Sequence, residues 1–464
     1  MIDIAVVTLY LAAVFAFGLV IGAKTSSFEG YAVAGRSLGS MVIFATLSAS
    51  FIGGGFSIGN AEKVFLFGVA NIVALWGFSF KEILVAQYLA PKMDRFRWAV
   101  SVGDIMETGF GRMGRLFSGI FALFLCSGIV GAQIGGIGAV FRIFLGLDTV
   151  LGIWIGCGIV ICYTTIGGMR AVIFTDIVQF VILSIGIPLV LVFGIIYVGG
   201  IENFVSSVPA EHLILPGPDH SWITLMALFL AFAFGEALVP PYVQRLLIGR
   251  TSRAVAKGTL LAGIFSIPFF AITGFIGLVA LAIDPDIPAA LALPHVIATV
   301  MPTVLGGLVV AGVISIVMSS ADSFLNSAGV ALVNDIVRPL RAKPLSDGAT
   351  LLLARVATFA VGVSAVAFAL TVESVLDILL TAYTYWAPVI VVPLAATILG
   401  VQRHKMVFLM AAVAGIVSAF GWNILLGKPY GVEGFVIGTV FNAAVFLLIK
   451  PRTRGPTNRP QDVL

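Results

Sequence analysis

Charged residues are scarce in this chain of 464 residues. Lys, Arg, Asp and Glu make up 10% of the sequence, hydrophobic residues make up 60%, and the mean hydropathy is +1.12. Soluble domains carry about 25% charged residues, and no soluble fold of this length has enough interior to bury so large an apolar fraction. The composition therefore excludes a water-soluble protein and indicates a surface that faces lipid.

Cysteine and histidine are also too few to suggest a catalytic or metal centre. The three cysteines, Cys126, Cys157 and Cys162, lie in apolar stretches without the spacing of a metal or disulfide framework. The four histidines lie in loops or at the ends of apolar stretches. Since no nucleophile–base pair stands out, we expect a protein that is not an enzyme and has no organic cofactor.

Thirteen apolar stretches are long enough to cross a bilayer, which takes about 20 mostly apolar residues. They are residues 3–23, 39–62, 65–90, 114–145, 148–166, 170–198, 221–246, 255–283, 303–336, 350–372, 374–400, 406–426 and 432–450. No connection between them is long enough to fold as a soluble domain. The sequence predicts an all-α membrane protein with about 13 transmembrane helices, one domain over residues 1–464, and a tail at 451–464.

Lys and Arg are distributed unevenly among the connections. With the N-terminus outside, 22 of the 26 fall in the inner connections and tail, with Arg245 counted among them. Lys63, Arg142 and Lys428 fall outside, and Lys81 falls within a span. Cytoplasmic loops carry the excess of basic residues. We expect a multi-pass cell-membrane protein with its C-terminus in the cytoplasm, in contact with membrane lipid and with no nucleic-acid partner.

Nucleotide-binding motifs are not convincing in this chain. Residues 109–114 match the dinucleotide pattern GxGxxG, but they lie between two predicted spans and not after a strand. Because no nucleotide-binding module is recognisable, we expect that ATP is not the energy source.

Polar side chains form a stripe in the span at 303–336. Five residues fall on one helical face: Ser315, Ser319, Asp322, Ser323 and Asn326. Oxygen atoms suit hard cations such as sodium, if the preference of calcium and magnesium is extended to it. Hydrogen bonding between neighbouring helices is the alternative. Ionisable residues also enter the spans at Lys81, Glu82, Asp176 and Glu236.

Two spans contain helix-breaking residues. Gly53, Gly54 and Gly55 lie in the middle of one, and Gly235-Glu236 with Pro240-Pro241 interrupts another. Such breaks are tolerated where they line a cavity, although glycines also permit close helix packing. Five spans at 39–198 and five at 221–400 predict an inverted repeat. One extra helix at 3–23 precedes it, and two at 406–450 follow.

Three segments resemble the sodium/solute symporter family. They are residues 165–179 (TIGGMRAVIFTDIVQ), 30–39 (GYAVAGRSLG) and 319–327 (SSADSFLNS), and the resemblance covers roughly residues 25–400. It implies a leucine-transporter-like five-plus-five fold. It further implies a sodium-coupled symporter, acting as a monomer, that imports a small organic solute by alternating access. A proton-coupled or uncoupled carrier on the same fold, or a transporter-like sensor, is the alternative.

The resemblance also implies where sodium binds. The main site would use the carbonyls of Ala49, Ile52 and Ile316 with the hydroxyls of Ser319 and Ser320. A second site would use Asp176, Ser319, Asp322 and Ser323. Asp322 stands where some relatives carry a hydroxyl, so this second site is expected to be more acidic or to bind a proton. For Asp176, the alternative is a structural pairing with Arg170 or nearby backbone.

Candidate substrate residues surround the two interrupted spans. They are Phe51, Phe56, Trp76, Glu82, Phe234, Glu236, Tyr383 and Trp386. Phe51 and Phe56 stand where relatives often place a polar side chain, which argues against a sugar-like polyol. Glu236 favours a substrate with an amine or several donors. For each aromatic residue, ordinary packing is the alternative.

Overall fold

Helices account for nearly all regular structure in the protein. The computed structural model describes residues 4–218, 220–370 and 382–449. Within these ranges, ten helices are long and apolar enough to cross a membrane, or eleven if one bent pair is counted as a span. This confirms a multi-pass all-α membrane protein.

Several predicted spans begin and end within a few residues of the observed helices. These are α1 (Ile4–Gly22), α7 (Thr149–Gly167), α8 (Met169–Tyr197), α16 (Asp347–Ala369) and α19 (Lys405–Phe420). Local signals set such ends. Asp148 accepts hydrogen bonds from the N–H groups of Val150 and Leu151 and so caps α7. Gly168, with φ +56°, separates α7 from α8.

The first glycine-rich span is broken, as predicted. Helix α3 (Ser40–Phe51) and helix α4 (Gly54–Phe67) meet at a bend of 54°. We call the residues between them, Ile52 and Gly53, the first break. Helix α4 continues past the predicted end at residue 62, and α5 (Ala70–Leu84) follows. The chain turns later because Gly68, with φ +68°, packs against the backbone of His212.

The second interrupted span is also two helices. Helix α10 (Trp222–Phe234) ends before Gly235, and α11 (Pro240–Leu247) begins at the proline pair. Proline at the first position of a helix is favoured because its missing N–H needs no partner there. We call residues 235–239 the second break.

Three predicted connections are partly helical. Helix α6 (Val102–Leu145) begins well before residue 114 and bends at Gly111, whose φ is +67°. Arg112 and Arg115 therefore lie in a helix and not in a loop. The predicted outer loops at 199–220 and 284–302 contain α9 (Ile201–Ser207) and α13 (Ala292–Val300). Charged and proline-containing residues predict loops here, but the structure places them in the start of α6 and in two short helices.

The count of thirteen spans is not reached by helix length alone. Helix α10 and helix α20 (Gly434–Leu448) are apolar but shorter than a full span. The predicted span at 374–400 lies partly outside the described residues, which resume at 382 and include α18 (Val392–Leu399). The predicted tail at 451–464 lies wholly outside them.

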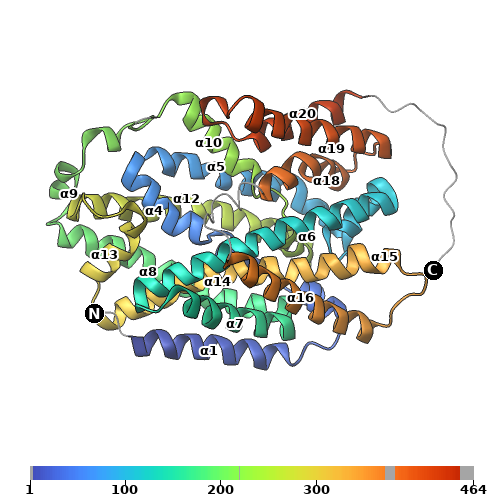
Figure 1. The fold of residues 1–464 in the computed structure, drawn as a ribbon, viewed down its shortest axis with the longest axis horizontal. Helices are drawn as coiled ribbons and strands as arrows, with labels where there is room; N and C mark the ends of the chain where they lie inside the picture. Colours follow the sequence, from blue (N-terminus) through green and yellow to red (C-terminus); the bar gives the residue numbers. More distant parts are fainter. Residues whose placement is uncertain (1–3, 219, 371–381, 450–464) are drawn as a thin grey trace.

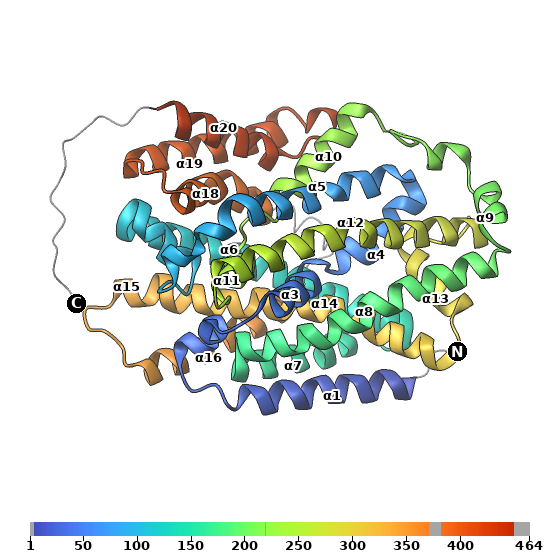
Figure 2. The ribbon, with the colours of Figure 1, turned by 180° about the vertical axis from the view of Figure 1, so that it is seen from behind.

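The long helices run roughly along one axis of the molecule (Figure 1). Helix α14 (Thr303–Val330) lies beside α6 in the centre, and α12 (Ser252–Ile283) lies between α5 and α8 (Figures 1 and 2). Helix α1 follows one edge, while α19 and α20 follow the opposite edge.

Helix α14 is surrounded by protein over most of its length. Residues 309–331 are all buried, because α14 packs against α3, α6, α7, α8 and α16. The polar stripe predicted on this helix therefore faces other helices and not lipid.

Candidate functional site

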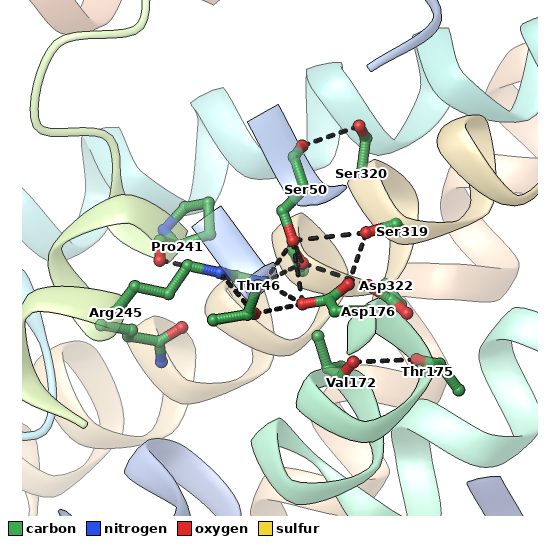
Figure 3. Close-up of polar contacts among 12 residues, drawn as sticks. Thr46, Ser50, Val172, Thr175, Asp176, Pro241, Arg245, Ser319, Ser320 and Asp322 are labelled. Carbon is green, nitrogen blue, oxygen red and sulfur yellow. Dashed lines mark hydrogen bonds and ion pairs between the residues drawn. The ribbon is translucent and has the colours of Figure 1, made fainter. Parts of the chain in front are cut away.

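The first break meets the polar stripe of α14. The Ser320 hydroxyl donates a hydrogen bond to the Ser50 carbonyl, 2.9 Å away, in the last turn of α3 (Figure 3). A Cβ atom on Gly53 would lie 2.6 Å from Ser320 Oγ. Only glycine leaves room for this approach, so the sequence of the break determines how closely the two helices meet.

The last backbone carbonyls of α3 also lie at the first break. Ile52 leaves the helical conformation with ψ 56° and Gly53 is extended, so the last turn of α3 has no helix to continue its hydrogen bonds. Ala49, Ile52 and Ile316 are all buried. A helix C-terminus carries partial negative charge. Carbonyls of α3 and hydroxyls of α14 thus form a neutral, oxygen-rich setting suited to a monovalent cation.

An acidic cluster lies one turn away, where the second sodium site was predicted. The Ser319 hydroxyl donates to Asp176 Oδ1 at 2.5 Å, and Thr46 also donates to Asp176. The Tyr163 hydroxyl donates to Asp322 Oδ2 at 2.5 Å, and Ser323 donates to Asp322 Oδ1 at 3.1 Å. The structure brings the four predicted residues together on α8 and α14.

The cation in this cluster is Arg245, which lies in α11 and not in an inner connection as predicted. Its side chain is fully buried, and Nη2 lies 2.9 Å from Asp176 Oδ2. Nη2 also donates to Ser50 at 2.5 Å (Figure 3). It donates to Ser323 at 2.7 Å as well. Arg245 therefore stands among the residues predicted to hold a second cation.

The ion pair also bears on the structural pairing that is the alternative for Asp176. Its partner is Arg245 and not Arg170, whose guanidinium lies beside Gly30 of α2 (Phe28–Val33). A signal for Arg245 existed, because it lies inside the span predicted at 221–246. Basic residues within spans are functional by default.

Hydrogen bonds make this buried charge tolerable. A buried ion pair is stable only when its remaining donors and acceptors are satisfied. Arg245 meets this condition through the Pro241 carbonyl, 3.1 Å from Nη1, and Thr46, 3.1 Å from Nε, besides the contacts of Nη2. The pair therefore ties α11 to α3, α8 and α14 in one arrangement.

A second acidic group lies near the first break. The Tyr242 hydroxyl donates to Glu82 Oε2 at 2.8 Å, and Lys81 Nζ lies 2.9 Å from Glu82 Oε1. Lys81 Nζ also lies 3.8 Å from the centre of the Phe78 ring, and the Phe51 ring packs edge-on against Tyr242 at 5.4 Å. The carboxylate of Glu82 is thus already neutralised by a lysine that aromatic faces stabilise.

The carboxylate at the second break is not neutralised in this way. The Tyr383 hydroxyl donates to Glu236 Oε1 at 2.6 Å, and Trp386 Nε1 donates to the Ala237 carbonyl at 3.2 Å. The other oxygen, Glu236 Oε2, is buried and has no hydrogen-bond partner among the described residues. Glu236, Tyr383 and Trp386 therefore gather at the second break, as predicted.

The remaining substrate candidates make contacts typical of packing. The Phe56 ring lies against the rings of Phe78, Phe232 and Phe270. Trp76 Nε1 donates to the Ile267 carbonyl of α12 at 3.1 Å, and Phe234 is half-buried against the core. The structure does not bring these three residues to a shared polar site.

The segment at 165–179 has a structural explanation as well. A Cβ atom on Gly168 would lie within 2.5 Å of the Tyr31 carbonyl, so this positive-φ position must be glycine. The Tyr31 hydroxyl donates to Thr358 at 2.8 Å. The segment therefore seats α2 against α7, α8 and α16 and fixes the start of the helix that carries Asp176.

Known proteins match this chain along most of its length. Residues 31–406 match the Sodium:solute symporter family. The chain is 26% identical to the High-affinity choline transporter 1 of Drosophila melanogaster over 75% of its own length, and spans 58% of that relative. It is also 26% identical to the High-affinity proline transporter PutP of Bacillus subtilis, over 75% of this chain and 76% of PutP.

A solved structure shares the fold. The outward-open, substrate-bound Na+-coupled sialic acid symporter superposes with a TM-score of 0.83 and 20% identity, over 98% of this chain and 99% of that one. The shared fold and the family match agree. The chain therefore belongs to the Sodium:solute symporter family, whose members are membrane transporters and not enzymes.

Proposed function

We propose that the protein is a sodium-coupled symporter that moves a small organic solute across the cell membrane by alternating access. The observation that carries this proposal is the contact of Ser320 with the Ser50 carbonyl at the first break. There, sodium would be held by the carbonyls of Ala49, Ile52 and Ile316 and the hydroxyls of Ser319 and Ser320.

Neutral ligands suit this task because the ion must be released as well as bound. Sodium at this place bridges α3 and α14 and so favours the conformation in which the first break is ordered. A membrane potential of 100 mV contributes about 2.3 kcal/mol per charge, and a tenfold sodium gradient adds about 1.4 kcal/mol. One ion per cycle then supports a solute gradient of roughly several hundredfold.

The detailed architecture is part of the proposal. We propose thirteen spans with an inverted repeat of residues 39–198 and 221–400, flanked by residues 3–23 and 406–450. Two observations support it: both halves contain a broken helix, and those breaks follow similar positions in each half. The excess of basic residues in the inner connections supports an orientation with the N-terminus outside and the C-terminus in the cytoplasm. The protein is proposed to act as a monomer.

The solute is proposed to bind between the two breaks and to carry a cationic nitrogen. Glu236 supports this, because its Oε2 atom is buried without a partner and a carboxylate attracts an ammonium group. Tyr383 and Trp386 supply aromatic surface beside it. Choline and proline, for which two relatives are named, both contain such a nitrogen.

The second sodium site at Asp176, Ser319, Asp322 and Ser323 remains a separate proposal. The guanidinium of Arg245 donates to both Asp176 and Ser323. A second sodium ion therefore binds there only when Arg245 moves away, which would make that ion dependent on movement of α11.

Uptake by proteoliposomes tests the function. A thermal-shift screen of amines, amino acids, carboxylates and sugars, each with and without sodium, first identifies the solute. Uptake of that solute is then compared in sodium and in potassium at equal ionic strength and fixed pH. We expect uptake to fall to background without sodium. Unchanged uptake in potassium rejects sodium coupling, and uptake that follows a pH gradient instead indicates a proton-coupled carrier.

A further inference from the structure

A buried cavity lies along α14 beyond the acidic cluster. It is small, with room for roughly one water-sized particle. It is lined by Ser101, Val102, Ala122, Pro240, Gln244, Ser327, Val330, Ala331 and Asp335, all of them buried. These residues come from α6 and its N-terminal cap Ser101, from α11, from α14 and from the π-helical turn η6 (Ala331–Val337) that continues α14. We call this space the inner cavity, because in the proposed orientation this end of α14 lies at the cytoplasmic side.

Hydroxyl groups connect the first break to the inner cavity. Ser319, Ser323 and Ser327 are spaced by four residues and lie on one face of α14. Ser323 Oγ lies 3.1 Å from Ser50 Oγ, and Ser327 Oγ lies 2.9 Å from the Ser323 carbonyl and 2.6 Å from Gln244 Oε1. Oxygen atoms therefore follow one another from the main sodium position to the cavity wall.

Asp335 is a buried acidic residue at the end of this series of oxygen atoms. Its side chain is fully buried, and its hydrogen bonds converge on one oxygen. Ser101 donates to Oδ1 at 2.5 Å and Asn334 donates to the same atom at 2.9 Å. Oδ2 has no hydrogen-bond partner among the described residues. A buried carboxylate oxygen without a partner is costly, and a cation in the cavity would relieve that cost.

The surrounding charges also favour a cation. Arg115 is the guanidinium nearest to Asp335, with its Nε 3.8 Å from Oδ1. Its stronger contacts are with Asp104 at 2.9 Å and Glu107 at 2.7 Å. Arg338 donates to the Asn334 side chain and makes no ion pair with these acids among the described residues. Three carboxylates therefore share one guanidinium, which leaves excess negative charge around Asp335.

Helix α6 is shaped to receive the Asp335 carboxyl group. A Cβ atom on Gly103 would lie 2.3 Å from Asp335 Cγ, and one on Gly119 would lie 2.5 Å from Asp335 Cβ. Two glycines on the same helix thus allow the acidic side chain to press against its backbone. A residue whose only purpose was helix packing would not need an ionisable group at this place.

We propose that the inner cavity is a transit site for sodium, in which the Asp335 carboxylate and the oxygens of Ser327, Gln244 and Ser101 hold the ion between the main site and the cytoplasm. This inference rests on the proposed function. Successive weak sites allow an ion to leave without full dehydration at any single step. Arg245 lies beside Ser323, at the entrance to this route, so displacement of its guanidinium would open the way.

Inhibition by internal sodium tests the proposal. Net uptake is measured into membrane vesicles of one orientation, at fixed external sodium and with increasing sodium inside. In the wild type, internal sodium occupies the transit site and slows net uptake. In Asp335→Asn, which keeps the shape and the Oδ1 acceptor, we expect about tenfold more internal sodium to be needed. The external sodium concentration for half-maximal uptake should not change.

Two further variants complete the experiment. Ser327→Ala should shift internal inhibition in the same direction, and it provides the test if Asp335→Asn fails to insert. Asp94→Asn, on the exposed surface beside Arg97, is the matched control and should behave as the wild type. Unchanged internal inhibition in Asp335→Asn, or equal shifts in the internal and external requirements, overturns the transit site. Wild-type uptake without any sodium dependence overturns the proposed function instead.

Discussion

The two helix breaks use the same backbone device with different side chains. The first break contains Gly53 and faces serine hydroxyls of α14. The carbonyl beside it, that of Ser50, accepts a hydrogen bond from the uncharged Ser320 side chain. The second break ends in a proline-started helix and carries Glu236 hydrogen-bonded to Tyr383. Both expose backbone in the middle of the protein, but only the second break itself contains a charged residue, Glu236.

This difference suggests a division of work. A neutral site of carbonyls and hydroxyls binds a small cation weakly enough to release it. A buried carboxylate with one free oxygen instead selects an organic group with a compensating charge. The first break is therefore expected to determine the sodium requirement and the second break the affinity for solute. Variants at one break should leave the parameter of the other unchanged.

The largest expected effect is at the first break. Replacing both Ser319 and Ser320 with alanine removes the two proposed hydroxyl ligands. The sodium concentration for half-maximal uptake should rise about a hundredfold, which corresponds to ~2.7 kcal/mol. Ser418→Ala, on the peripheral helix α19, is the control, because its hydroxyl bonds only within its own helix. A wild-type sodium requirement in the double variant would remove the proposed main site.

A smaller effect is expected at the second break. Glu236→Gln removes the charge while keeping a similar shape and an oxygen for Tyr383. The KM for a solute with a cationic nitrogen should rise roughly tenfold, since a charge-assisted contact contributes about 1.5–3 kcal/mol. The sodium requirement measured at saturating solute should stay the same. If sodium dependence shifts and KM does not, the proposed division between the breaks is wrong.

The smallest effect is expected from a comparison of Gly53, in the first break, with Gly55, which lies just after it in α4. An alanine at Gly53 places its Cβ 2.6 Å from Ser320 Oγ, so that hydroxyl must rotate away from the Ser50 carbonyl. Losing this contact should raise the sodium requirement about fivefold, which is ~1 kcal/mol. Gly55→Ala is the matched control, because its Cβ meets no atom within 4 Å. Equal sodium requirements in the two variants would mean that the close approach at Gly53 does not shape the ion site.

Much of the fold follows from hydrophobic length and from glycine and proline. Long apolar runs gave α1, α7, α8, α16 and α19 within a few residues, and both breaks were predicted from their local sequences. The early start of α6 could not be predicted in this way. Charged residues such as Arg115 and Asp104 are typical of a loop in sequence. In the structure they pair with each other, and Arg115 also pairs with Asp335 of η6, which is far away in the chain.

The candidate site was predictable where a motif carried it and not where long-range pairing did. Ser319 and Ser320 meet the first break as expected. The position of Arg245 within a predicted span marks it as unusual, but its partner, Asp176, is 69 residues away, and nothing local shows that the two charges meet. Trp76, Phe56 and Phe234 were put forward on residue type alone, and side-chain direction decides whether such residues reach a site.

The burial of α14 over residues 309–331 restricts how the molecule can change shape. A helix that is enclosed on all sides over these residues cannot rotate without displacing all its neighbouring helices at once, and packed interiors resist gradual deformation. We therefore expect α14 to keep its place during transport, while the helices around it move at the two breaks. Ions would then pass along α14, and the helices around it would open and close the route.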